Sequence, residues 1–168
     1  MEVEDSKTGG RYEIMIERLT LNDFKIVKKD KIRFDSFNWS KYREQEVYKL
    51  RLTECQEILG LMCLNEFPPE TGINALEIEL LEVSVENRGN NKRLQGIAGC
   101  LIAFACREAF NRGYKGWVFL IPKSELIEHY SKAYGFVHIP LRAVARPEGF
   151  MELETGRSVQ LLKKYGLI

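Results

Sequence analysis

The fold is decided by residues 75–121, which read ALEIELLEVSVENRGNNKRLQGIAGCLIAFACREAFNRGYKGWVFLI. Residues 75–85 alternate apolar and polar side chains, which is the two-residue period of a β-strand. Apolar residues then recur at helical spacing through 96–112, and Gly113 follows where a glycine ends such a helix. The unbroken apolar run 117–121 is typical of a buried parallel strand. The stretch therefore predicts one strand–helix–strand crossover unit.

The strand at 75–85 has an irregular apolar phase. Apolar side chains occupy even positions up to Leu80 and odd positions from Leu81 onward. A regular ladder cannot change its buried face in this way, whereas a β-bulge near Leu80–Leu81 can. The alternative is a strand that is buried on both faces. In either case Glu77 and Glu79 fall in the polar phase, and we expect them to face solvent.

The flanking segments predict further strands and helices around this unit. Strand patterns cover 11–19, 47–52, 58–64, 136–145 and 150–153, and the first three are spaced as an antiparallel meander. Helical patterns cover 124–134, with Ser124 as N-cap and Gly135 as terminator, and 155–165, whereas 21–43 suits short helices or an irregular arm. The predicted fold is α/β: a mixed, mostly antiparallel twisted sheet with one central parallel crossover and helices on both faces.

Composition limits the class of protein. The chain has 168 residues, 45% hydrophobic and 29% charged, with a net charge of +1. These values suit an ordinary globular domain at 11–168, preceded by a flexible polar tail at 1–10. No apolar run is long enough to cross a bilayer, and no secretory pattern opens the chain. We expect a cytoplasmic protein, not bound to membrane, and a monomer or homodimer.

Cysteine and histidine usage argues against a metal site. The cysteines at 55, 63, 100 and 106 form no C-x-x-C pair, and neither histidine, at 129 and 138, lies near a cysteine in sequence. Zinc sites need such clustering, so we predict no metal and reduced core cysteines.

The start of the helix at 96–112 has the properties of an anion site. The first N–H groups of a helix lack intrahelical partners, and the helix dipole adds positive potential there. Gly96, Ala98 and Gly99 are small, so a phosphate can approach the backbone closely. Arg88 and Arg93 lie just upstream as cations. The segment predicts a phosphate cradle, without the fingerprints of the P-loop or the dinucleotide fold.

The segment Arg93-Leu94-Gln95-Gly96-Ile97-Ala98 resembles the [QR]-x-x-G-x-[GA] pyrophosphate motif of the GNAT superfamily of N-acetyltransferases. In that superfamily the motif opens the helix after the fourth strand, and a bulge in this strand makes a slot for pantetheine. The segment 130–136, YSKAYGF, is similar to the superfamily's aromatic segment after the fifth strand. The resemblance covers 46–138 and implies acetyl-CoA as co-substrate.

The resemblance also implies roles for individual residues. Glu82, on the strand before the motif, would be the general base that takes a proton from the amine. The superfamily's general-acid tyrosine position is Ser131 here, so either Tyr130, one residue away, is the general acid for the CoA thiolate, or no tyrosine has this role. The implied cofactor-binding residues are Val83, Ser84, Val85, Arg88, Arg93, Leu94, Gln95, Gly96, Ile97, Ala98, Gly99, Ser124, Tyr130 and Ser131.

The resemblance implies an N-acetyltransferase that moves an acetyl group from acetyl-CoA to a primary amine by direct attack in a ternary complex. One alternative is a CoA-binding or regulatory module with little or no activity. Another is a toxin-type enzyme acting on charged tRNA, against which the near-neutral charge argues, so nucleic acid is not an expected partner. The aromatic residues Phe34, Phe37, Trp39 and Tyr42 either line an acceptor pocket or pack against the sheet.

Overall fold

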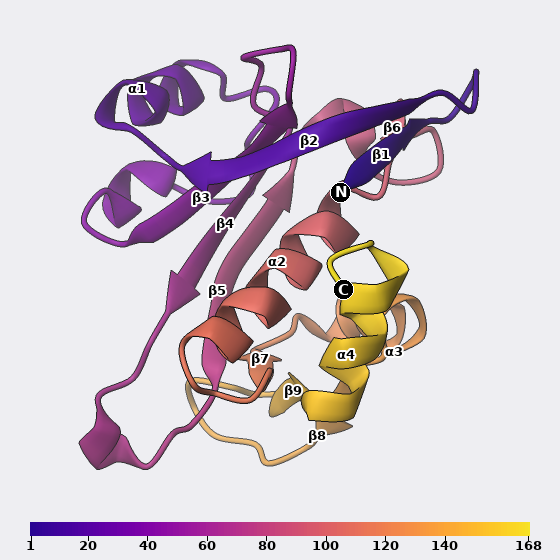
Figure 1. The fold of residues 1–168 in the computed structure, drawn as a ribbon. Helices are drawn as coiled ribbons and strands as arrows, with labels where there is room; N and C mark the ends of the chain where they lie inside the picture. Colours follow the sequence, from indigo (N-terminus) through magenta and orange to yellow (C-terminus); the bar gives the residue numbers. More distant parts are fainter. The chain divides into compact units, whose positions relative to one another are not determined.

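The computed structural model describes residues 1–168, which divide into two compact units. Unit 1 comprises Met1–Leu64 and Leu80–Ile102, and unit 2 comprises Asn65–Glu79 and Ala103–Ile168. Strand β5 (Leu76–Val83) and helix α2 (Ile97–Asn111) contribute residues to both units (Figure 1). The expectation that 11–168 is one domain stays a prediction, and each unit is described separately.

Unit 1 contains an antiparallel sheet in the order β6-β1-β2-β3-β4. Its strands are β1 (Glu2–Asp5), β2 (Arg11–Arg18), β3 (Glu46–Leu52), β4 (Gly60–Asn65) and the two-residue β6 (Leu94–Gln95). The expected strands at 11–19, 47–52 and 58–64 and their antiparallel pairing are confirmed. The predicted flexible tail at 1–10 is wrong, because β1 pairs with β2 on one side and β6 on the other. Asp5 also closes the turn after β1 by accepting the amides of Lys7 and Thr8.

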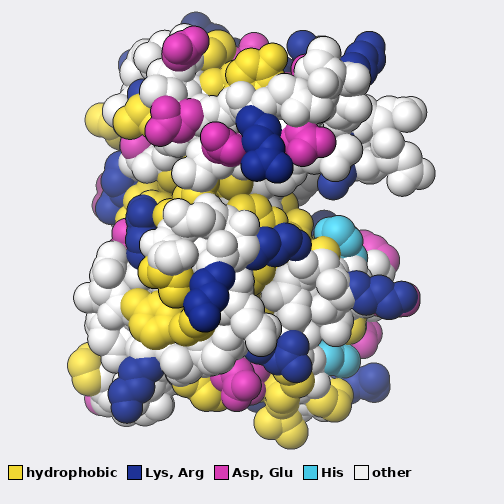
Figure 2. Space-filling model, turned by 45° about the vertical axis from the view of Figure 1, so that its right-hand side comes forward, with side chains coloured by type: hydrophobic (Ala, Val, Ile, Leu, Met, Phe, Trp, Pro, Cys, Tyr) yellow, Lys and Arg dark blue, Asp and Glu magenta, His cyan; other side chains and the backbone are white.

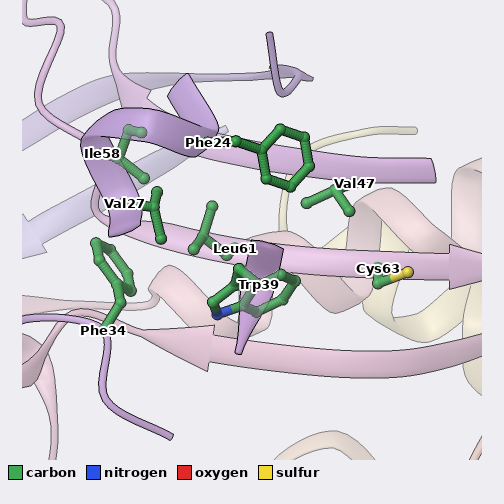
Figure 3. Close-up of a cluster of buried hydrophobic side chains, with 8 residues drawn as sticks. All are labelled: Phe24, Val27, Phe34, Trp39, Val47, Ile58, Leu61 and Cys63. Carbon is green, nitrogen blue, oxygen red and sulfur yellow. The ribbon is translucent and has the colours of Figure 1, made fainter. Parts of the chain in front are cut away.

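Helix α1 (Leu21–Lys29) covers one face of this sheet. It begins with a capping box, in which Thr20 and Asp23 each accept the other's backbone N–H. The short 3-10 helix η1 (Trp39–Tyr42) completes the arm predicted at 21–43. Figure 3 shows Val27 of α1 directed toward Leu61 of β4 and Phe24 toward Val47 of β3, with Trp39 next to Leu61. Phe34 and Trp39 are buried here and Phe37 and Tyr42 pack against them, so the packing role expected for these aromatics is confirmed.

The first turns of α2 cover the opposite face of β4. Adjacent strand residues point to opposite faces, and Gly60, next to Leu61, meets α2. A Cβ at Gly60 would lie 2.8 Å from Ile97 and 3.0 Å from Leu101. Gly60 therefore allows the start of α2 to pack closely on β4, and unit 1 has helices on both faces.

Unit 2 contains strands in the order β5-β7-β9-β8. Strand β5 pairs in parallel with β7 (Val118–Leu120), as the crossover prediction required, and β9 (Phe150–Leu153) pairs antiparallel with β7 and β8 (Val137–Ile139). The remaining elements are η2 (Pro69–Thr71), η3 (Val85–Asn87, in unit 1), η4 (Ser124–Leu126), α3 (Ile127–Tyr134) and α4 (Thr155–Lys164). The mixed, mostly antiparallel sheet with one parallel pair is thus as predicted.

Two details near the end of the chain differ from the expectations. Ser124 does not cap the helix, because a 3-10 turn precedes α3 and Leu126 occupies its N-cap. The strand expected at 136–145 is only Val137–Ile139, after which Pro140 begins a loop with an isolated bridge at Ala143↔Arg146. None of the helices is both long and apolar enough to span a membrane.

The cysteines are free thiols. Cys63, Cys100 and Cys106 are buried, as expected, but Cys55 is exposed in the turn between β3 and β4. Burial raises the pKa of Cys100 and of Cys106 to about 11, so both remain protonated and unreactive at neutral pH.

Candidate functional site

The first turn of α2 is rich in small residues, with Gly96, Ala98 and Gly99. Gly96 precedes the helix with a φ of +99°, a left-handed conformation that favours glycine. The first intrahelical bond runs from Cys100 N to Gly96 O, 2.9 Å. The amides of Ile97, Ala98 and Gly99 lie ahead of it, where a helix has no internal acceptor for its N–H groups. The first turn can therefore donate several backbone hydrogen bonds to one anion.

Strand β1 borders this turn and fixes β6, the strand just before it. Glu4 is paired with Gln95 and Asp5 with Leu94, and Ser6 N donates to Arg93 O at 3.0 Å. The segment that the sequence predicts to be a flexible tail thus holds the predicted pyrophosphate motif in place. The side chains of Arg93 and Gln95 are exposed. Arg93 also lines a pocket of about 300 Å³ together with Tyr12 and Cys55.

The loop between β5 and β6 is closed by the buried side chain of Asn87. Its Oδ1 accepts the amide of Leu94 at 2.8 Å, and its Nδ2 donates to Ser84 Oγ at 3.0 Å. Arg93 N also donates to Glu86 O at 3.1 Å. Both ends of the loop are therefore tied together immediately before the cradle along the chain.

The residues expected to pair with pantetheine are already bonded within unit 1. Ser84 N donates to Leu59 O at 2.9 Å and Val85 N donates to Arg33 O at 3.0 Å. The carbonyl of Val83 accepts Nε of Arg88. The amides of Ser84 and Val85 cannot also bind a ligand in this arrangement, because each N–H donates one such bond. Pairing of pantetheine with this segment is unsupported at these two residues.

Glu82, the predicted general base, is enclosed. Its side chain is 1% exposed. Oε1 accepts Nε1 of Trp39 at 2.7 Å, and Oε2 accepts Ser36 N at 2.9 Å and Nη2 of Arg88 at 2.8 Å. The guanidinium of Arg88, which is predicted to bind the cofactor, likewise forms hydrogen bonds within the protein. Neither role gains support from these contacts, and both stay predictions.

Glu77, expected to face solvent, is buried instead, with 8% exposure. Asn65 Nδ2 donates to its Oε1 at 3.2 Å, and no cation pairs with it. Burial raises the pKa of Glu77 above its ordinary value of 4.5, against the opposing effect of the Asn65 hydrogen bond, and the negative charge of Glu79 adds to the rise. A carboxylate with a raised pKa is suited to removing a proton near neutral pH.

Glu77 lies in a row of side chains across the sheet of unit 2. It is paired with Phe119 on β7, which is paired with Glu152 on β9, and paired residues share a face. The ring of Phe119 lies 5.8 Å from that of Phe67 and 6.4 Å from that of Phe150. Burial, with Glu154 nearby, also raises the pKa of Glu152. The row is an aromatic surface with a carboxylate on either side.

Tyr130 is half-buried on α3. Its ring contacts Phe136 at 5.7 Å and Tyr134 at 6.1 Å. Burial raises the pKa of its phenol, which therefore stays protonated and able to donate a proton. Ser131, the alternative residue, is exposed, and its backbone carbonyl accepts Gly135 N.

Sequence patterns missed Glu77 for an identifiable reason. The alternation of Glu77 with Leu76 and Ile78 predicts a strand with one solvent-exposed face. The neighbouring run 117–121, however, is apolar at every position, which indicates a strand covered on both faces. A strand paired with it is covered as well, and this signal could have identified Glu77 as buried.

Comparison with solved structures identifies the fold. A GNAT-family acetyltransferase from Listeria monocytogenes matches with a TM-score of 0.59 at 15% identity, over 90% of this chain and 97% of that one. The Bacillus subtilis N-acetyltransferase YlbP, solved with coenzyme A, matches with a TM-score of 0.57 at 16% identity, over 84% and 96%. AtaT, solved with acetyl-methionyl-tRNAfMet, matches with a TM-score of 0.54 at 18% identity, over 90% and 99%.

No family model and no curated protein sequence matches the chain. The structural matches nevertheless extend over nearly the whole of each chain. The fold is therefore that of the GNAT superfamily, as the resemblance at 93–98 and 130–136 implied.

Proposed function

We propose that this chain is an N-acetyltransferase that moves the acetyl group of acetyl-CoA to a primary amine by direct attack in a ternary complex. The observation that carries the proposal is the first turn of α2. Gly96 opens it in a left-handed conformation, and its free amides suit the CoA pyrophosphate. Arg93 is exposed beside it as a cation for the phosphates.

In this proposal Glu77 is the general base. The attacking amine must be neutral, and a carboxylate with a raised pKa can remove the ammonium proton at neutral pH. The resemblance implies Glu82 instead, but the carboxylate oxygens of Glu82 already accept hydrogen bonds from Trp39, Ser36 and Arg88. Glu77 has only the Asn65 amide as a hydrogen-bond partner, which leaves lone pairs for a substrate.

Tyr130 is the proposed general acid. The amine nitrogen attacks the thioester carbonyl carbon, the carbon–sulfur bond breaks, and the leaving sulfur takes the phenolic proton. The second proton, which the nitrogen loses as the amide forms, passes to solvent, and the phenolate regains a proton from solvent. A phenol that remains neutral at working pH is suited to this step.

The acceptor in this proposal is a primary amine carried on an apolar group. The rings of Phe67, Phe119 and Phe150 offer the apolar group a surface, and Glu77 lies in the same row as Phe119. The amino group of a charged tRNA is also a primary amine, and AtaT was solved with an acetylated aminoacyl-tRNA. Figure 2 shows both Lys or Arg and Asp or Glu side chains on one face, and the chain's net charge is only +1, so we favour a small amine or peptide.

A thiol-release assay with acetyl-CoA tests the proposal on small amines, peptides and aminoacyl-tRNA. We expect turnover with at least one acceptor and a large loss in Glu77→Gln. The matched control is Glu70→Gln, an exposed carboxylate in the same unit, which should keep full activity. CoA binding without turnover on any acceptor would favour the regulatory module instead.

A further inference from the structure

Glu82 joins three separate pieces of unit 1. Trp39 belongs to η1, Ser36 to the segment before it, and Arg88 to the loop that leads to the cradle. The two arm residues lie 43 and 46 positions away along the chain. A carboxylate with three charge-assisted or buried donors is held rigidly, and its donors are held with it.

Two arginines also connect the arm and the loop, one contributed by each segment. Arg33 of the arm reaches Glu86 of the loop, with Nη2 to Oε1 at 2.6 Å. Arg88 of the loop reaches Asp35 of the arm, with Nη1 to Oδ1 at 2.9 Å, in addition to Glu82. Nη2 of Arg88 also donates to Arg33 O at 3.2 Å. The arm at 33–39 and the loop at 82–88 are thereby fixed to each other.

The same loop is bonded to the start of α2. Glu86, held by Arg33, accepts Arg93 N on its carbonyl, and Asn87 accepts Leu94 N on its side chain. Gly96 and the first turn of α2 follow within a few residues. A change at Glu82 can therefore reach the cradle through Arg88, the adjacent chain at 86–87 and the two hydrogen bonds that this chain accepts from Arg93 and Leu94.

We propose that Glu82 is a positioning residue, which through Arg88 and the arm fixes the loop at 84–94 so that the first turn of α2 is presented to CoA. This rests on the proposed function as far as CoA is concerned. The geometric part of the inference depends only on unit 1. It assigns no proton transfer to Glu82.

Two measurements on Glu82→Gln, with the exposed Glu54→Gln of the same unit as control, test the inference. The first is amide exchange at Arg93 and Leu94 without ligand, which we expect to be about tenfold faster in Glu82→Gln, since a bond to a charged partner is lost. The second is CoA affinity and kcat. We expect CoA binding to weaken about tenfold while kcat at saturating CoA and its pH profile hold within about threefold.

Each alternative gives a different result. A kcat reduced by about a hundredfold with CoA binding and exchange unchanged would make Glu82 a catalytic base and overturn the inference. Unchanged exchange together with unchanged CoA affinity would also overturn it. If the wild-type chain binds no CoA, the proposed function fails, but the exchange measurement still decides whether Glu82 fixes the loop.

Arg88→Lys provides the same test if Glu82→Gln does not fold. It keeps a positive charge beside Glu82 but lacks the planar fork that reaches Val83 O, Asp35 and Arg33 O together. We expect faster exchange at Leu94 and weaker CoA binding, in the same proportion. Normal exchange in this variant would contradict the assigned path.

Discussion

The indole nitrogen of Trp39 donates a hydrogen bond of 2.7 Å to Oε1 of Glu82, and both side chains are almost completely buried. The cluster in which Trp39 packs and the ionic junction at Glu82 are therefore parts of one structure. Trp39→Phe keeps most of the packing but removes the donor. We expect unfolding to become easier by about 1–3 kcal/mol, because a buried charged acceptor loses a partner. Urea denaturation measures this, and an unchanged midpoint would show that the bond does not stabilise unit 1.

Gly60 sets how closely the start of α2 packs on β4. In Gly60→Ala the new methyl group would lie 2.8 Å from Ile97, so the helix start must shift. We expect a loss of about 1–3 kcal/mol in stability from overpacking, and weaker CoA binding. Gly156→Ala in α4 is the control, since the nearest atom to its Cβ lies 4.0 Å away, and it should leave CoA binding unchanged. Equal CoA affinity in the two variants would contradict this account of Gly60.

The raised pKa of Glu77 predicts a specific dependence of the chain's stability on pH. Its pKa in the folded chain is raised, so the folded state binds the proton more tightly than the unfolded state does. Its contribution to stability is thus greatest at low pH and is lost as pH rises through the raised pKa. Glu77→Gln, which mimics the protonated form, should melt higher than wild type at pH 7, by roughly 2–4 °C for each kcal/mol. The difference should shrink toward pH 4, and a difference independent of pH would refute the assignment.

The same ionisation should govern catalysis if Glu77 is the base. The rate should rise with pH through a pKa above the ordinary value of 4.5, and Glu77→Gln should lose this limb together with about 10²–10⁴-fold in rate. A pH–rate profile on any active acceptor measures it. A variant that retains the limb would show that another group removes the proton.

Tyr130→Phe tests the proposed general acid. We expect kcat to fall by about 10²-fold while CoA affinity stays within about threefold, because the phenol acts on the leaving thiolate only as the bond breaks. Ser131→Ala is the comparison, since position 131 corresponds to the superfamily's tyrosine. A loss of activity in Ser131→Ala with full activity in Tyr130→Phe would exchange the two roles.

Much of the fold could be predicted from local sequence patterns, because the apolar period and the positions of glycines are set by the helix or strand in which they occur. The strand–helix–strand unit and the start of α2 near Gly96 are examples. Contacts between residues that are far apart in the sequence could not be predicted in this way. Nothing in the strand at 75–85 reveals that Trp39 and Ser36 surround Glu82, or that Glu77 is buried. The short polar strand β1 was missed for the same reason, since it is stabilised by β2 and β6 and not by its own pattern.

Titration calorimetry of CoA against wild type, Gly96→Ala and Gly96→Glu tests the central claim most directly. Both substitutions impose the same backbone strain at a φ of +99°, but only the second places a negative charge at the first turn of α2. We predict that wild type binds CoA, that Gly96→Ala binds more weakly, and that Gly96→Glu does not bind measurably. Equal CoA affinity in Gly96→Glu and Gly96→Ala, or no CoA binding by wild type, would contradict a pyrophosphate site at Gly96–Gly99.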